Sequence, residues 1–300
     1  MNRRRLLVLT VVAAVALAAC GDDGDDGDDG DTGTGGRPPS GGTEHPTGAD
    51  ELVVRVATGG GLVPSTSRLA EIPELAVYGD GRAIVVGPTT LEFPGPALPN
   101  LQQGDLSDDE LQELVRAARA AGLLADEPPD YGEPAVTDMP TTTVTIDIGG
   151  VERTVGAYAL RFEEGDDDLD ADQRDARERL REFLTVVDAD IATEPYQADS
   201  VAVFVRPYDP DEIVEPSVAE PHSWPLGDLA GAGEPYEGFD DTRCLVVTGA
   251  DAQTVLAAAE DAREGDPWRA AGVDYALVFR PLLPDETGCA DLAPGQTAGA

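Results

Sequence analysis

The stretch TTTVTIDIGGVERTVGAYAL, residues 141–160, decides the fold class of this 300-residue chain. Val144, Ile146 and Ile148 alternate with polar residues, and this period of two places them on one face of a strand. The glycine pair at 149–150 supplies the left-handed conformation that a tight hairpin turn needs. The stretch therefore predicts an antiparallel hairpin with one apolar face and one wet face.

The segment SDDELQELVRAARAAG, residues 107–122, predicts a helix instead. Ser107 and Glu110 have the spacing of a capping box. Leu111, Leu114, Val115 and Ala118 follow at helical spacing, and Gly122 is placed to end the helix.

A second helix is expected at 171–187, with an apolar stripe of five residues. Between the stripe positions stand four arginines among acidic residues, and we predict that they form a solvated, salt-bridged face. The stripe comprises Ala176, Leu180, Phe183, Leu184 and Val187, and the arginines are Arg174, Arg177, Arg179 and Arg181.

The remaining pattern completes an α+β fold of mostly antiparallel sheets with helices packed on one face. The further elements are a strand at 51–58, a hairpin at 74–87 turning at Asp80-Gly81, strands at 200–206, 243–248 and 274–280, and a helix at about 250–263. This order allows two related subdomains, residues 51–195 and 196–292, followed by a disordered tail at 293–300. A long Pro- and Gly-rich connection is expected between 207 and 240.

The chain begins with MNRRRLLVLTVVAAVALAAC. Three arginines precede the apolar run Leu6–Ala19, whose 14 residues are fewer than the about 20 that a transmembrane helix needs. The pattern is typical of a secretory signal peptide, here residues 1–19. Its end, LAAC at 17–20, resembles the lipobox of bacterial lipoproteins, and an ordinary secretory signal with a chance cysteine is the alternative.

The lipobox resemblance implies cleavage before Cys20 and a diacylglyceryl group on its thiol. Acyl chains would then hold the mature protein on the extracytoplasmic face of the cell membrane. Residues 20–50 follow as the lipidated cysteine and an acidic Gly/Asp tether, too poor in apolar side chains to fold. As a flexible coil, such a tether spans roughly 30 Å. Calcium binding by its GDD units is the alternative.

Composition limits the function. The formal charge is −39, with 59 acidic and 20 basic residues, and all the basic residues are arginine. Loss of the signal peptide removes three arginines and makes the charge −42. We therefore expect no nucleic-acid partner, which needs clustered positive charge. The absence of lysine excludes Schiff-base and P-loop lysine chemistry. The composition of the chain, without lysine and rich in Ala, Gly, Asp and Pro, resembles that of exported proteins from GC-rich actinobacteria.

Two cysteines remain once Cys20 is lipidated. In an exported protein, Cys244 and Cys289 are expected to form a disulfide. The loop of about 45 residues that they close would contribute on the order of 4 kcal/mol through chain entropy. Free thiols, or a metal site that includes His222, are the alternatives.

The sequence offers few catalytic motifs. His222, in the 207–240 connection, is the sole histidine of the predicted folded part and a weak candidate for acid–base chemistry. The acidic run at 163–172 has Asp166, Asp168 and Asp170 in an EF-hand register, but Ala171 and Arg177 occupy positions that need Gly and Glu. We interpret this run as a favourable charge before a helix. The glycines at 59–61 lack phosphate-loop spacing and are interpreted as a loop or bulge.

The chain also contains a short repeat: R-P-x-x-P-D-E occurs at 206–212 and at 280–286, each time after an apolar strand. The proline after each arginine cannot donate a ladder hydrogen bond, so each strand should end there. We predict that the two strands share a sheet and that Arg206 and Arg280 each meet a carboxylate. The repeat is then a structural echo of duplication. A chance match is the alternative, and a third option is a pair of turns that frame a binding surface.

These observations predict a lipid-anchored extracytoplasmic protein whose folded part is a non-catalytic binding or interaction module, with the membrane and an envelope partner or ligand as its partners and no cofactor. The alternative is a cell-surface hydrolase that uses carboxylates or His222. A solute-capturing lipoprotein for a transporter would need a cleft between two α/β lobes, which the many hairpins argue against.

Replacement of Cys20 tests the prediction that the protein is anchored to the membrane by lipid. Cys20→Ala should release the protein from membranes or leave it unprocessed, because no thiol remains to be acylated. Membrane fractionation and the intact mass of the mature chain report the result. An unlipidated parent protein, or unchanged fractionation of the variant, would contradict the prediction.

Overall fold

The computed structural model describes residues 45–63, 65–187, 193–210 and 220–292. The predicted signal peptide, Cys20, most of the tether and the tail at 293–300 lie outside these residues, as do Asp211 and Glu212 of the repeat. Residues 45–50, assigned to the tether from composition, belong to the described part: Arg82 donates a hydrogen bond of 2.7 Å to the carbonyl oxygen of Ala49.

Thirteen strands are assigned in the described residues. They are β1 (Leu52–Gly59), β2 (Leu75–Tyr78), β3 (Arg82–Val86), β4 (Leu101–Asp105), β5 (Thr141–Ile148), β6 (Val151–Tyr158), β7 (Glu194–Pro195), β8 (Ser200–Pro207), β9 (His222–Ser223), β10 (Glu234–Pro235), β11 (Arg243–Thr248), β12 (Pro267–Ala270) and β13 (Val273–Pro281). The helices are α1 (Asp108–Ala120), α2 (Ala171–Val187) and α3 (Gly249–Ala259), with 3₁₀ turns η1 (Ser65–Ala70), η2 (Glu163–Asp168) and η4 (Cys289–Leu292).

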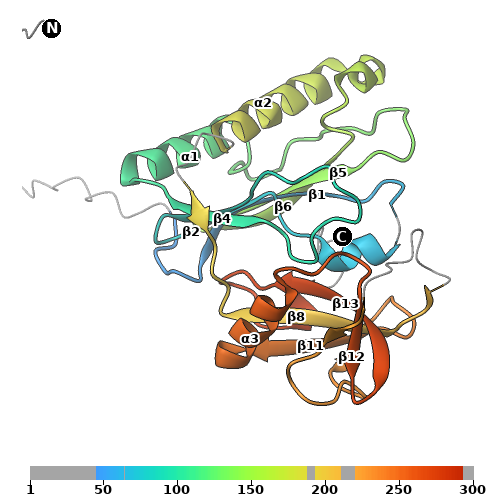
Figure 1. Cartoon of the computed structure of the whole chain (residues 1–300). Coiled ribbons are helices and arrows are strands. Elements are labelled where there is room, and N and C mark those ends of the chain that lie inside the picture. The colour runs from blue at the N-terminus through green and yellow to red at the C-terminus, as the bar shows by residue number, and fades with distance from the viewer. Residues whose placement is uncertain (1–44, 64, 188–192, 211–219, 293–300) are drawn as a thin grey trace, which may run out of the picture. The chain divides into compact units, whose positions relative to one another are not determined.

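The strands form two sheets (Figure 1). The first has the order β6-β5-β1-β2-β3-β4-β7 and the second the order β10-β11-β8-β13-β12-β9. All neighbours pair antiparallel except β9 and β12, which are parallel. The predicted α+β class with mostly antiparallel sheet is therefore confirmed.

The opening hairpin is confirmed as β5 and β6. Its glycines 149 and 150 have φ angles of 63° and 76°, the conformation that a tight turn requires of them. Along β5, burial alternates with a period of two, so Val144, Ile146 and Ile148 are buried. The opposite face of β5 is half-buried rather than fully wet.

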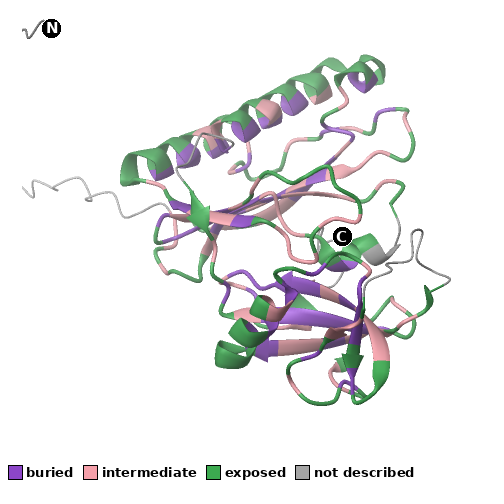
Figure 2. Ribbon diagram, viewed as in Figure 1, coloured by how far each residue is buried: buried purple, intermediate pink, exposed green. Residues whose placement is uncertain are grey.

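The predicted helix at 107–122 is α1, and both hydrogen bonds of the Ser107–Glu110 capping box are present. The buried stripes of α1 and α2 join β1, β5 and β6 in one hydrophobic cluster. Figure 2 shows the buried side of α2 turned toward the sheet and its exposed side turned away. The helical periodicity therefore identified the core faces of both helices correctly.

The prediction that Arg177 is solvated is wrong. Its side chain is fully buried, and it donates hydrogen bonds to the carbonyl oxygens of Tyr131, Tyr158 and Ala159. Its Nε lies 2.6 Å from Oδ1 of Asp166, which also pairs with Arg181. Burial lowers the pKa of the Arg177 guanidinium despite the nearby carboxylate. Asp166 thus serves as a buried counter-ion, a role beyond the favourable helix-end charge we predicted for its segment.

The second sheet has its own hydrophobic cluster. Residues of β8 and β13 pack with α3 and Trp268, whose ring meets Phe279 edge-on at 5.1 Å between centroids. The predicted helix at about 250–263 begins close to its expected start but ends earlier, at Ala259. Strands β4 and β12 were not predicted, because neither has a clear period-two pattern.

The two copies of the repeat lie on neighbouring strands. β8 and β13 pair directly, with Arg206 opposite Ala276 and Arg280 opposite Ala202, so the prediction that they share a sheet is confirmed. Because the strands are antiparallel, the two copies leave the sheet at opposite ends.

The second copy forms a buried ion pair within itself. Arg280 donates two hydrogen bonds to the Glu286 carboxylate, at 2.9 and 2.8 Å, and both side chains are almost fully buried. Its Nε donates to the carbonyl oxygen of Glu71 at 2.8 Å, while the Leu283 amide donates to Glu286 at 2.7 Å. Both charges therefore have the partners that burial demands.

Asp285, the residue before Glu286 in the second copy of the repeat, contacts the first sheet. Asp285 accepts hydrogen bonds from Nη2 of Arg55, at 2.7 and 2.8 Å, and from the Tyr78 hydroxyl at 2.8 Å. Burial and the Asp285 carboxylate raise the pKa of Tyr78, so the phenol remains a donor. Leu283 also packs with Tyr78 and Ile84 in a cluster on this side of the first sheet. We call Arg55, Tyr78, Arg280, Asp285 and Glu286 the inter-sheet network.

Removal of one member of the buried pair should be costly. We expect Glu286→Ala to lower the free energy of unfolding by about 3 kcal/mol or more, because the Arg280 charge stays buried without its carboxylate. Urea unfolding measures this loss.

The control is Glu237→Ala, since Glu237 is exposed and should change the unfolding free energy by less than about 0.5 kcal/mol. The double variant Arg280→Met/Glu286→Leu should recover much of the loss, because it removes both charges. If Glu286→Ala lowers the unfolding free energy by less than about 1 kcal/mol, the Arg280–Glu286 ion pair does not stabilise the segment after β13.

Candidate functional site

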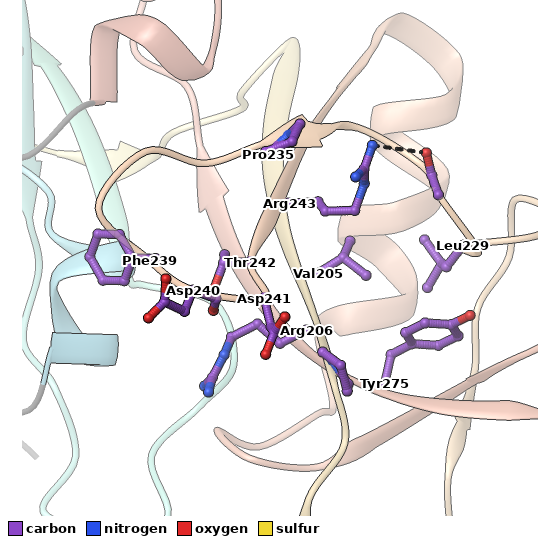
Figure 3. A pocket seen from close by; sticks show the side chains of 12 residues that line it. Val205, Arg206, Leu229, Pro235, Phe239, Asp240, Asp241, Thr242, Arg243 and Tyr275 are labelled. Atoms are coloured by element: carbon purple, nitrogen blue, oxygen red, sulfur yellow. Dashed lines mark hydrogen bonds between the residues drawn. The ribbon is translucent and has the colours of Figure 1, made fainter.

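An open pocket of about 500 Å³ lies at one end of the second sheet (Figure 3). Five segments line it: the end of β8, the loop before β10, β10 itself, the turn that leads into β11, and the start of β13. The lining residues are Val205, Arg206, Pro207, Leu229, Gly231, Pro235, Phe239, Asp240, Asp241, Thr242, Arg243 and Tyr275. Its volume lies in the range of about 300–1,000 Å³ that is typical of small-ligand sites.

Apolar side chains form one wall of the pocket. Val205 and Leu229 are 4% and 1% exposed, and Tyr275 packs against the same hydrophobic cluster as these two residues. In Figure 3 the three side chains lie on one side of the view, while Phe239 lies on the other. Because Val205 and Leu229 belong to the core, this wall is held in place by the fold rather than by a ligand.

Arg243, at the start of β11, organises the loop above the pocket. Its Nε donates to the carbonyl oxygen of Ala232 at 3.0 Å, and its Nη2 donates to those of Gly231 and Gly233. Figure 3 shows its guanidinium turned away from the aspartates, and the dashed line there is its hydrogen bond to the Gly231 carbonyl. The donors of Arg243 thus serve the loop rather than the pocket.

Gly233 lets this loop approach β11 closely. Its φ angle is 74°, and a Cβ at this position would lie far inside contact distance of the Cys244 carbonyl. Only glycine tolerates both conditions.

Two adjacent aspartates form the acidic part of the pocket. Asp240 and Asp241 are exposed, and within the described residues neither carboxylate has a hydrogen-bond or ion-pair partner. Asp241 has a φ angle of 56°, a left-handed conformation that costs energy outside glycine, although aspartate tolerates it better than most residues. The turn therefore presents two unsatisfied acceptor groups beside the apolar wall.

A cysteine pair lies directly beside the pocket. Cys244 and Cys289 are at disulfide-bonding distance, with their Cα atoms 6.1 Å apart, as the cysteine count predicted. The pair attaches η4 to β11, next to Arg243. Nearby, the Tyr236 hydroxyl donates to the carbonyl oxygen of Leu292, and burial raises the pKa of this phenol. These contacts fix the segment from β10 to β11 that carries much of the pocket lining.

The prediction that His222 lies in the long 207–240 loop is wrong. His222 lies in β9, at the edge of the second sheet. Its Nε2 lies 2.9 Å from Oδ2 of Asp266, and its ring stacks on Trp268 with centroids 5.0 Å apart. The side chains of His222 and Asp266 are 28% and 6% exposed. A buried carboxylate that orients an accessible imidazole is one part of an acid–base site. The same contacts also simply hold β9 against β12.

The other candidate motifs do not assemble a metal site. Among the described residues, no group of three or more His, Cys, Asp or Glu side chains could hold a metal ion. Asp166, the first position of the EF-hand register, is instead committed to Arg177 and Arg181. Cys244 has Cys289 as its partner rather than His222.

Sequence reasoning did not find the pocket. Its residues come from five separate segments, and only the pairing of β8 with β11 and β13 brings them together. The one available signal was the concentration of Gly, Pro and aromatic residues in the 207–240 connection, which indicates a loop with a role.

Comparison of the chain with protein-family models, with curated proteins and with solved structures gives no match in any of the three. Within the described ranges, no helix combines the length and apolar character needed to cross a membrane.

Gly233→Ala tests how the pocket is built. We expect a loss of about 2 kcal/mol or more in unfolding free energy, because the added methyl meets the Cys244 carbonyl and the φ angle is strained. Gly238→Ala is the matched control: its φ angle is 83°, but nothing lies within 4 Å of the added Cβ, so only strain of about 1 kcal/mol remains. Equal losses for the two variants would show that the close approach at Gly233 is unimportant.

Proposed function

We propose that this chain is a lipid-anchored extracytoplasmic protein whose folded part is a non-catalytic binding module at the cell envelope. The observation that carries the binding role is the open pocket, with its rigid apolar wall and two aspartates whose carboxylates have no partner among the described residues. A preformed cavity that combines core apolar residues with a few polar groups is the usual form of a small-ligand site.

The anchoring part rests on the lipobox resemblance at 17–20 and the acidic segment after it. Acyl chains on Cys20 would hold the chain at the membrane, and the tether would present the folded part away from an anionic surface that repels it. The cysteine pair is consistent with this oxidising location, because disulfides persist outside the cytoplasm.

The folded part itself is proposed to be two related subdomains that meet near residue 195. The first sheet takes its strands from Leu52 to Pro195 and the second from Ser200 to Pro281. The repeat on β8 and β13, within the second sheet, supports an origin by duplication of strand-and-turn units more than a functional pair of turns, because its two exits lie at opposite ends of that sheet.

The proposal is tested by blocking the pocket from its rim. Pro235 is an exposed lining residue, so Pro235→Trp should fill part of the cavity without disturbing the core. Native mass spectrometry of the full-length protein recovered from its own envelope should show a retained small ligand that this variant lacks. Glu234→Trp is the control, because Glu234 is the exposed neighbour that does not line the pocket. A ligand that both variants retain, or a parent protein without any ligand, would contradict the binding role.

A hydrolase is the second candidate, favoured by the His222–Asp266 hydrogen bond alone. If it were correct, His222→Gln should abolish turnover of ester and glycoside substrates by the full-length chain. We expect no turnover that depends on His222, because its contacts with Asp266 and Trp268 suffice to explain its placement.

A further inference from the structure

We propose that the ligand of the pocket is a small organic amine with an apolar body, whose ammonium group binds Asp240 and Asp241. This inference rests on the proposed binding function and specifies the chemistry of its ligand. Three features of the pocket carry it: the distribution of unused hydrogen-bonding groups, the shape of the apolar wall, and the charge of the chain.

The first feature is an imbalance between donors and acceptors. Four charged residues line the pocket, and their formal charges cancel. The two arginines are engaged, however: Arg243 donates to three carbonyl oxygens of the 231–233 loop, and Arg206 also has an interaction of its own. The two carboxylates have no partner within the described residues. The two charged groups that are left without a partner are therefore both acceptors, and a ligand with N–H groups and a positive charge would supply the donors that they lack.

The second feature is the position of the carboxylates relative to the apolar wall. In Figure 3, Asp241 lies near the centre of the view, with Asp240 to one side of it and Val205, Leu229 and Tyr275 to the other. An ammonium at Asp241 would thus place its attached carbon chain or ring over Val205, Leu229 and Tyr275. The aromatic face of Tyr275 can also attract a cation that approaches it closely.

The strained turn supports the same assignment. Asp241 keeps a left-handed backbone, while its carboxylate has no hydrogen-bond or ion-pair partner in the part of the chain that the structure describes. Strain of this kind is concentrated at ligand-binding turns, where a ligand interaction offsets its cost.

The third feature is the field of the whole chain. A formal charge of −39 across 300 residues raises the local concentration of organic cations and depletes anions near every open site. An anionic ligand would have to enter against this field, and one of the two arginines, Arg243, already donates to three carbonyl oxygens of the loop. A neutral ligand would leave both carboxylates without a counter-charge.

The test compares three probes that share one phenyl ring: 2-phenylethylamine, 2-phenylethanol and 3-phenylpropionate. Isothermal titration of the full-length chain at pH 7 and low salt should show saturable binding of the amine. We expect its affinity to exceed that of the alcohol at least about tenfold, since only the amine can form a charge-assisted hydrogen bond. The carboxylate should bind more weakly than either.

The matched variants remove the same number of charges from the same stretch of chain. Asp240→Asn/Asp241→Asn should weaken binding of the amine about tenfold or more. Glu234→Gln/Glu237→Gln removes two exposed carboxylates that do not line the pocket and should change the affinity less than about twofold. If both double variants weaken binding of the amine equally, the amine is attracted only by the overall negative charge of the chain, and the inference is overturned.

Other outcomes separate this inference from the proposed function. If the amine does not bind, but an envelope ligand is lost with Pro235→Trp, the ligand class is wrong and the binding function stands. If the amine binds with the predicted dependence on the aspartates, but the protein carries neither lipid nor envelope ligand, the ligand class stands and the proposed function fails. Preferred binding of the carboxylate would overturn the inference directly.

Discussion

The structure depends on the inter-sheet network. Arg280 and Glu286 are each less than a tenth exposed, and charges so deeply buried are tolerated only when every one of them is paired and hydrogen-bonded. The pair is satisfied by its own two hydrogen bonds, by the Glu71 carbonyl and by the Leu283 amide. Asp285, the residue beside Glu286, is then held where Arg55 and Tyr78 can reach it. The position of the second sheet's last strand is thus tied to the first two strands of the chain.

The same rule explains how so acidic a chain separates structural from accessible carboxylates. Asp166, Asp266 and Glu286 are buried, and each is committed to an arginine, a histidine or a backbone amide. Asp240 and Asp241 are exposed and have no partner for their carboxylates within the described ranges, although they are the same chemical groups. Composition cannot distinguish these two classes, because 59 acidic residues look alike until the fold assigns partners to some of them. In such a protein, an acid without a partner beside an apolar cavity is more informative than the total charge.

Local patterns predicted the elements whose neighbours are close in sequence. The hairpin at 141–160 and the helix at 107–122 follow from alternation, a glycine turn and a capping box, and all of these act within a few residues. Arg177 was misjudged because its helix position is polar, while the carbonyl groups that accept its hydrogen bonds come from segments up to 46 residues away. His222 was placed in a loop because a two-residue strand has no periodicity to detect. The pocket lay beyond prediction for a related reason, since it exists only once β8, β11 and β13 lie side by side.

The long reach of the Asp285 contacts has a consequence for biosynthesis. Asp285 lies 230 residues after Arg55 and 207 residues after Tyr78. A chain that emerges amino terminus first therefore presents these two donors long before their acceptor exists. Until the last strand has emerged, the side of β1 and β2 that meets Leu283 and Asp285 stays open, and the nascent protein depends on local hairpins and helices alone. Closure of the native structure belongs to the end of synthesis, and a chain truncated before Asp285 would lack the means to complete it.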